Sequence, residues 1–202
     1  VHPVVPSRGS LGASGDLASH SVDLAQHLTG DLVVRLSAVT ETFISERPLL
    51  DAAGRGPVTV DDAAAFIARL SSGATATFEV SRLAPGRRNA LRIEINGTGG
   101  SIAWSLERLN ELELHLSADE AEVRGSRTVL VTEPEHPWIA AWWPPGHIIG
   151  WEHTFTHEFK TFLEAIAAGE APAPAFSDGL QVQRVLDAVV RSARTGSWQG
   201  AA

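Results

Sequence analysis

Four ionisable side chains recur at helical spacing near the start of this sequence: Asp16, His20, Asp23 and His27. Their successive offsets of four, three and four residues place them on one face of an α-helix. A carboxylate one turn from an imidazole can act as a proton-transfer pair, because an imidazole exchanges its proton near neutral pH. The spacing therefore predicts a helix that presents an acid–base row to a cleft. The alternative reading of these residues alone is a solvated helix face, which is the commoner case.

Residues 14–30 carry signals for both ends of this helix. Ser14 is expected to cap the first turn, where Asp16 also interacts favourably with the helix dipole, and Gly30 is expected to end the helix. Asp23 and His27 are expected to form helix-surface pairs, worth about 0.2–0.5 kcal/mol, without a catalytic role. The apolar residues of the segment are expected to pack on the core: Leu17, Ala18, Val22, Leu24, Ala25 and Leu28.

The composition is that of a globular domain large enough to bury a core. The chain has 202 residues, of which 44% are hydrophobic and 20% charged. Its net charge of -8 argues against a nucleic-acid partner, and its basic residues cluster only at Arg87-Arg88. No apolar run reaches the roughly 18–20 residues needed to span a bilayer, and the absence of cysteine excludes a disulfide framework. We therefore expect a cytoplasmic protein that binds neither nucleic acid nor membrane.

Alternating and β-branched runs in the middle of the chain predict a series of strands. The clearest signals are a hairpin over 63–83 and a second hairpin that turns at 96–100. Arg82, near the end of the first hairpin, could orient a substrate hydroxyl or carboxylate, or lie on the surface. Residues 46–57 contain two Gly and two Pro and are predicted to be a loop. Strands are predicted at 32–44, 63–70, 74–83, 91–95, 102–104, 112–116 and 128–131.

Two further helices are predicted near the end of the chain. The first covers 151–168 with Gly169 as its stop, and the second covers 178–193 with Ser177 as its cap. With helices at both ends and strands between them, the predicted fold class is α+β, a large mainly antiparallel sheet with helices packed on one face. Because the strands keep apolar residues on both faces, we expect another subunit to cover the open sheet face, in a homodimer or homotetramer.

A Trp-rich segment and two histidines form a second group of candidate site residues. Trp142 and Trp143 precede Pro144-Pro145-Gly146-His147, a pattern that suits either the apolar face of a sugar ring or interface packing. His153 and His157 stand four residues apart, which could present two imidazoles to one metal. Because the pattern is not His-Glu-x-x-His, we expect no metal site.

Four motifs together resemble one enzyme family in their order and spacing. Residues 15–23 read Gly-Asp-Leu-Ala-Ser-His-Ser-Val-Asp and resemble that family's Gly-Asp-x-x-x-His-x-x-Asp helix, and residues 94–101 resemble its Glu-x-x-Gly-x-x-Gly strand and turn. Further matches are residues 142–147 and the helical segment 159–166. Over nearly its whole length the chain resembles the C-terminal, substrate-binding domain of the Gfo/Idh/MocA family of NAD(P)-dependent oxidoreductases.

The resemblance implies a part in hydride transfer between a nicotinamide cofactor, NAD or NADP, and a sugar, cyclitol or related polyol. It implies a fold like the C-terminal domain of glyceraldehyde-3-phosphate dehydrogenase. His20 would then exchange the proton of the reacting hydroxyl, and Asp16 would help to place the substrate. The candidate substrate-binding residues are His147, His153, Trp143 and Arg82.

The resemblance also implies a domain that this chain does not contain. In the family, the dinucleotide-binding fold lies upstream and includes a Gly-rich phosphate turn and a Glu-Lys-Pro segment. The Gly-rich residues 9–15 do not follow a predicted strand, so they do not predict a pyrophosphate site. The chain starts at Val1 and contains no Met, so we expect residues 1–202 to be the substrate-binding and oligomerisation domain of a longer protein, inactive by itself. The alternative is a non-catalytic module that binds sugar or assembles oligomers.

Overall fold

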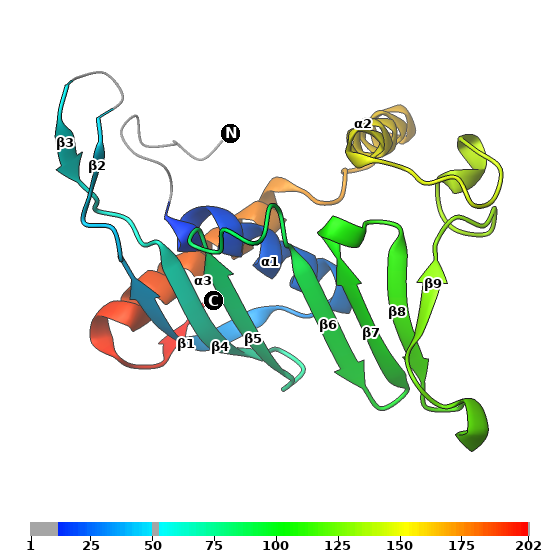
Figure 1. Ribbon diagram of the computed structural model, residues 1–202, viewed down its shortest axis with the longest axis horizontal. Coiled ribbons are helices and arrows are strands. Elements are labelled where there is room, and N and C mark those ends of the chain that lie inside the picture. The colour runs from blue at the N-terminus through cyan, green and yellow to red at the C-terminus, as the bar shows by residue number, and fades with distance from the viewer. Residues whose placement is uncertain (1–11, 50–52, 202) are drawn as a thin grey trace. The chain divides into compact units, whose positions relative to one another are not determined.

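The computed structural model describes residues 12–49 and 53–201 of the chain (Figure 1). These residues form two compact units, each with its own four-stranded antiparallel sheet. The first unit consists of the described residues up to Gly86 together with those from Phe176 onward, and the second consists of Arg87–Ala175. The chain therefore leaves the first unit once, builds the second, and returns.

The first unit is built on a sheet in the order β10-β1-β4-β5. β4 (Ala63–Leu70) and β5 (Thr75–Ser81) form the predicted hairpin, and its turn contains Gly73 with a φ of 94°. Gly suits this turn because a residue without a Cβ adopts positive φ at little steric cost. β1 (Val33–Glu41) pairs with the other edge of β4, and the short β10 (Gln199–Gly200) pairs with β1.

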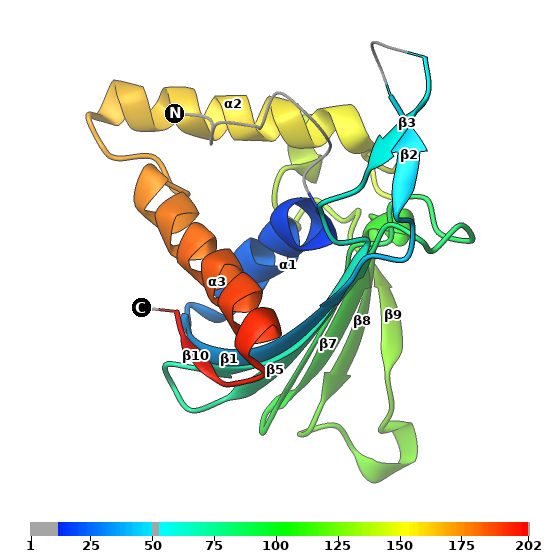
Figure 2. The ribbon, with the colours of Figure 1, turned by 90° about the vertical axis from the view of Figure 1, so that its left-hand side faces the viewer.

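Two helices cover one face of this sheet (Figure 2). α1 (Ala13–Thr29) packs on β4 and β5, α3 (Phe176–Thr195) packs on β1, and the two helices contact each other. The covered face is apolar because alternate residues of a strand point to the same side, and those of β4 are buried here: Ala64, Phe66, Ala68 and Leu70. In this unit the predicted packing of helices on one sheet face is confirmed.

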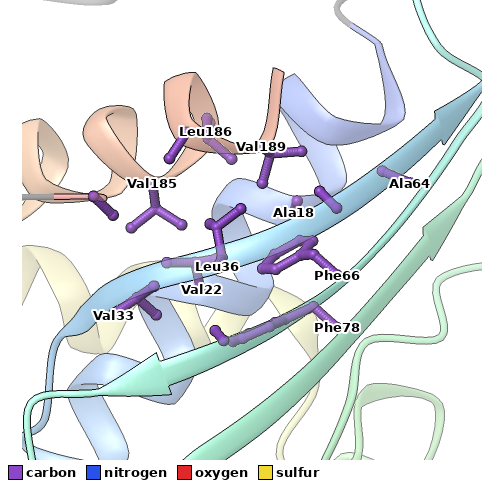
Figure 3. Close-up of a cluster of buried hydrophobic side chains, with 14 of the residues drawn as sticks. Ala18, Val22, Val33, Leu36, Ala64, Phe66, Phe78, Val185, Leu186 and Val189 are labelled. Atoms are coloured by element: carbon purple, nitrogen blue, oxygen red, sulfur yellow. The ribbon is translucent and has the colours of Figure 1, made fainter. Parts of the chain in front are cut away.

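The core of the first unit lies between these helices and the sheet (Figure 3). Leu36 of β1 is fully buried and faces Val185 and Val189 of α3. The rings of Phe66 and Phe78, on neighbouring strands, stack with centroids 4.6 Å apart. Burial of each large side chain of this kind stabilises the fold by about 1.5–3 kcal/mol.

The first turn of α1 is capped from a distant segment. The helix begins at Ala13 with Gly12 as its N-cap, so the predicted Ser14 cap is wrong. The backbone N–H and the hydroxyl of Ser14 both donate to the Asp61 carboxylate at 2.7 Å, and the Ala13 N–H donates to the Asp61 carbonyl at 2.9 Å. Asp61 thus satisfies helix N–H groups that a local cap would otherwise satisfy. The predicted stop at Gly30 is confirmed by its left-handed φ of 66°.

The segment predicted to be a loop at 46–57 contains a small hairpin. β2 (Glu46–Pro48) and β3 (Arg55–Pro57) pair in antiparallel fashion, while residues 50–52 lie outside the described part of the chain. The loop prediction is wrong for the paired residues. Strands of three residues that include proline show no hydrophobic alternation, so the sequence carries no signal for them.

The second unit contains a sheet in the order β6-β7-β8-β9 (Figure 1). Gly100 lies at the tight turn between its first two strands, where a Cβ would lie only 2.1 Å from the carbonyl oxygen of His115. The strands are β6 (Arg92–Gly97), β7 (Gly100–Ser105), β8 (Glu111–Leu116) and β9 (Arg127–Leu130). Short 3-10 helices lie between the other elements: η1 (Leu106–Arg108), η2 (Ala121–Val123) and η3 (Ile139–Ala141).

The helix that closes the second unit, α2 (Trp151–Ala168), ends where predicted, at Gly169 with a φ of 71°. α3 begins at Phe176, so Ser177 lies inside its first turn and the predicted Ser177 cap is wrong. None of the helices in the described part of the chain is long and apolar enough to cross a bilayer.

The predicted α+β class is confirmed, and the strand pairs are antiparallel. The strands are divided between two four-stranded sheets and one small hairpin, where the sequence predicts one large sheet. The division falls between Arg82 and Leu91, where no residue is in a strand. Pro85 and Gly86 lie in this stretch, and both residue types disfavour continuation of a β-ladder.

The distant cap on α1 gives a first prediction. We expect Asp61→Ala to lower the free energy of unfolding by about 1–2 kcal/mol, because it removes the groups that accept from Ser14 at the helix start. Urea denaturation followed by far-UV circular dichroism measures the effect. Asp187→Ala, on the exposed side of α3, is the matched control and should change stability by less than about 0.5 kcal/mol. Equal stability of the two variants would show that the Asp61 cap contributes nothing.

Candidate active site

In the first unit, α1 presents Asp16 and His20 one turn apart on the same helix face. The Asp16 carboxylate forms an ion pair with the Nη2 atom of Arg82. The side chains of Asp16 and Arg82 are 39% and 29% exposed, so both remain accessible to a ligand. His20 is exposed, and no hydrogen bond or ion pair links its ring to another residue within 12–49 and 53–201. No described residue therefore engages either nitrogen of its imidazole.

A corner at Asp61-Asp62, just before β4, holds the elements that bring Asp16 and Arg82 together. Asp61 binds the first turn of α1 through Ser14, two residues before Asp16. The carbonyl of Asp62 accepts the backbone N–H of Arg82 at 2.9 Å, which positions the residue after β5. Asp61 thus fixes the start of α1, and the adjacent Asp62 fixes the backbone of Arg82.

The Asp62 carboxylate makes this corner rigid. It is almost completely buried, accepts the backbone N–H groups of Phe43 and Ile44 at 2.9 Å each, and pairs with Arg47. A buried carboxylate is costly unless it is fully hydrogen-bonded, and here each oxygen has a partner. The remaining ionisable residues of the row on α1, Asp23 and His27, make no hydrogen bond or ion pair with any described residue.

The N-terminus of α1 does not fit the phosphates of a dinucleotide. Its N–H groups at Ala13 and Ser14 are already bonded to Asp61, and a Cβ on Gly12 would lie 2.1 Å from an Asp61 carboxylate oxygen. A bound anion would meet this carboxylate, which repels it. Of the Gly-rich segment 9–15, residues 9–11 lie outside the described part of the chain.

In the second unit, the segment around η3 carries two of the candidate sugar-binding residues, Trp143 and His147, and both are exposed. The Nδ1 atom of His147 lies 3.0 Å from the carbonyl oxygen of Pro144. Because a carbonyl only accepts, Nδ1 carries a proton, and in the neutral form of the ring Nε2 is then an acceptor.

Two buried polar side chains anchor this segment. The amide of Asn110 is bonded twice to the backbone of Ile149, donating to its carbonyl at 2.8 Å and accepting its N–H at 3.0 Å. The hydroxyl of Thr132 accepts the N–H of Gly146 at 3.3 Å. The backbone on both sides of His147 is therefore held in place.

His153, the other candidate in this unit, is only 13% exposed. Its Nδ1 accepts the N–H of Gly150 at 3.1 Å, so Glu152, 3.9 Å from the same nitrogen, does not make an ion pair with it. The ring packs edge-on against Trp142 and Trp143, with centroid distances of 4.5 and 5.9 Å. Only its Nε2–H remains to meet a ligand.

Sequence reasoning missed the role of His157. Its Nε2 accepts the indole N–H of Trp142 at 2.7 Å, and its ring stacks on Trp138 at 4.7 Å. The spacing to His153 suggested a metal pair, but each of these imidazoles is bonded to an N–H donor, and no group of three or more metal-ligating residues occurs in the described ranges. The tryptophans just before α2 in the sequence are the signal that could have indicated this role of His157.

The environment of His157 favours its neutral form. Burial lowers the pKa of this imidazole, and electrostatic interaction with His153, whenever that ring is protonated, and with the Lys160 ammonium lowers it further. Below about pH 6.5 the unfolded chain therefore takes up the proton more readily than the folded unit does. The contribution of His157 to stability falls as the pH drops from that value toward its lowered pKa.

Comparisons with known proteins agree with the predicted resemblance. Residues 4–103 match the family model described as the GFO/IDH/MocA C-terminal domain. The chain is 42% identical over 200 residues to levoglucosan dehydrogenase from Pseudarthrobacter phenanthrenivorans, a match that covers 93% of this chain and 51% of that protein. The chain is therefore similar to the C-terminal domain of the Gfo/Idh/MocA family.

Solved structures give the same result. An oxidoreductase domain protein from Kribbella flavida superposes with a TM-score of 0.91 at 49% identity, over 96% of this chain and 51% of that one. Levoglucosan dehydrogenase in complex with NADH and L-sorbose superposes with a TM-score of 0.90 at 41% identity, over 97% of this chain and 52% of that one. The chain thus spans about half the length of the relatives it matches.

The exposed ion pair at the candidate site gives a second prediction. Because Asp16 and Arg82 are both about one-third exposed, we expect Arg82→Gln to lower the free energy of unfolding by less than about 1 kcal/mol. Urea denaturation measures this directly, with Arg124→Gln in the second unit as an exposed arginine control. A loss above about 2 kcal/mol would mean that Arg82 holds the fold together rather than serving the site.

Proposed function

We propose that this chain is the substrate-binding part of an NAD(P)-dependent dehydrogenase that oxidises a sugar, cyclitol or related polyol. The observation that carries the proposal is the exposed His20, which makes no hydrogen bond to another described residue and lies one turn from an Asp16 held by Arg82. The similarity to levoglucosan dehydrogenase supports it and makes levoglucosan the first sugar to test. A role as a sugar-binding or oligomerisation module without catalysis is the alternative that the experiment must exclude.

In this reaction His20 accepts the hydroxyl proton as hydride leaves the carbinol carbon, and it returns the proton in the reverse direction. Proton transfer by a positioned group of this kind raises the reaction rate about 10²- to 10⁴-fold. The Asp16 carboxylate, oriented by its bond to Arg82, accepts a hydrogen bond from a substrate hydroxyl.

The hydride acceptor is a nicotinamide nucleotide, which we assign to a dinucleotide-binding domain in the same full-length protein. The filled N-terminus of α1 supports this assignment, because the N–H groups at Ala13 and Ser14 are already bonded to Asp61. By itself this chain is expected to lack dehydrogenase activity. The absence of cysteine favours a cytoplasmic location.

The second unit is proposed to contribute contacts to the sugar. The exposed indole of Trp143 suits the apolar face of a pyranose ring, and the free Nε2 of His147 suits a ring hydroxyl. The remaining Nε2–H of His153 can donate to a sugar oxygen. These contacts would contribute to the affinity for the sugar.

A second copy of the chain is proposed to cover the open face of the first unit's sheet. Val39 and Ile67 point away from the helices and are 63% and 45% exposed, and Ala65 lies between them on the same face. Thr77 and Glu79 of β5 border this apolar centre, an arrangement typical of protein interfaces. Pairing of this face with itself would give a homodimer, or a homotetramer if a second surface also pairs.

The catalytic role of His20 gives a third prediction. In a polypeptide that joins this chain to its dinucleotide-binding domain, we expect His20→Ala to lower kcat by at least about 100-fold while the melting temperature stays within a few degrees. Reduction of NAD⁺ or NADP⁺ by levoglucosan and other polyols, followed by absorbance, measures kcat. His27→Ala is the control, because it removes an exposed imidazole from the same helix. Wild-type turnover in the His20 variant would refute the proposed function.

The interface gives a fourth prediction. We expect Ile67→Asp to convert the oligomer to monomers, because it introduces a charge at the centre of the open sheet face. Sedimentation velocity measures the oligomeric state, and Val123→Asp, at an exposed position in the second unit, should leave it unchanged. If the wild-type chain is already a monomer, this interface does not exist.

A further inference from the structure

His157 lies at the centre of an aromatic cluster in the second unit but has no part in the proposed proton transfer. The indole N–H of Trp142 donates to its Nε2 at 2.7 Å. Because an indole nitrogen is only a donor, Nε2 must be unprotonated and the ring neutral, with its proton on Nδ1. The bond joins α2 to the segment that carries Trp143 and His147.

The same ring supports a strained residue. Trp138 has a φ of 74°, a left-handed conformation that is unfavourable for a bulky side chain. Its indole stacks on His157 at 4.7 Å with an angle of 16° between the rings, and the ammonium of Lys160 lies 5.4 Å from the indole centroid. Strained backbone of this kind persists only where surrounding contacts hold it, and it concentrates at functional sites.

Protonation of His157 would oppose its hydrogen bond with Trp142. An N–H at Nε2 would point at the N–H of Trp142, leaving two donors face to face where there is now a hydrogen bond. The titratable and charged groups that act on His157 are His153 and Lys160, both on α2, and both disfavour added positive charge. The groups packed against it from the η3 segment are the indoles of Trp138 and Trp142, which do not titrate.

We propose that His157 is a positioning residue that holds the Trp138–Trp143 segment by accepting the Trp142 N–H and stacking on Trp138, and that its protonation releases this segment and weakens sugar binding. The effect on sugar rests on the proposed function, because Trp143 and His147 are its candidate sugar contacts. The effect on the aromatic cluster is independent of the proposed function.

Two variants separate the contacts that His157 makes. His157→Gln keeps an acceptor that can reach the Trp142 N–H but cannot titrate, whereas His157→Phe keeps a ring that can stack but has no acceptor. His27→Gln, which removes an exposed imidazole in the other unit, is the matched control. Near-UV circular dichroism and tryptophan fluorescence of the chain are recorded between pH 8 and pH 5, chosen to span the ordinary histidine pKa of about 6.5.

In the wild-type and His27→Gln proteins we expect a reversible spectral change below about pH 6.5. It should be absent in His157→Gln, and His157→Phe should show the acid-type spectrum already at pH 8. If the change persists in His157→Gln, another group titrates and the proposal is wrong. Because the Gln variant retains an acceptor, this comparison stays decisive even if the Phe variant does not fold.

Kinetics with levoglucosan, in the polypeptide that includes the dinucleotide-binding domain, test the positioning role. We expect the wild-type KM, relative to that of His157→Gln at the same pH, to rise about 3- to 10-fold on acidification, the size expected for loss of one hydrogen bond. Both proteins keep His20, so its own pH dependence cancels in this comparison. The His157→Phe KM should be raised relative to that of His157→Gln throughout. If the wild-type KM, relative to that of His157→Gln, stays constant over the pH range in which the spectra change, the positioning role is refuted while the proposed function stands. Absence of activity toward every polyol refutes the proposed function, and the spectra then decide whether His157 holds the segment.

Discussion

The corner at Asp61-Asp62 is the constraint on which the candidate active site depends. Its two carboxylates face in different directions: Asp61 holds the start of α1, and Asp62 is buried beneath the turn that follows β1. Through the Asp62 carbonyl the same corner also fixes the backbone of Arg82. A helix carrying an imidazole and a strand end carrying a guanidinium are therefore oriented by adjacent residues, and this leaves the Asp16–Arg82 pair at the surface without making it responsible for stability.

The two units position their candidate site residues by different means. In the first, the apolar side of α1 packs on the sheet, and the polar row is presented as a consequence of helix geometry. In the second, Trp143 and His147 lie outside any long element, and buried polar groups hold their backbone: the Asn110 amide at Ile149 and the Thr132 hydroxyl at Gly146. Such a segment is more readily altered than a helix, because its geometry depends on a few hydrogen bonds rather than on a whole packed face.

The similarity to the Gfo/Idh/MocA family and the chemistry of the site point in the same direction. The chain spans about half of the relatives it matches, and the N-terminus of its first helix is already occupied by a carboxylate. Both observations support the proposal that this half binds the sugar and takes its proton. His153 and His157 illustrate why spacing is weak support for a metal site: two imidazoles one turn apart can each be engaged by a single N–H donor.

The sequence by itself determined the features that depend on local periodicity and on glycine. It predicted the helix with Asp16 and His20 on one face, the hairpins at 63–83 and around 96–100, and the stops at Gly30 and Gly169, because these follow from side-chain spacing and positive φ. Only the tertiary structure decided that Asp61 rather than Ser14 caps α1, that Arg82 pairs with Asp16, and that His157 binds Trp142. Each of these contacts joins residues that are far apart in sequence or in different elements. Whether such groups meet depends on how the strands pair and the segments pack, which no local pattern encodes.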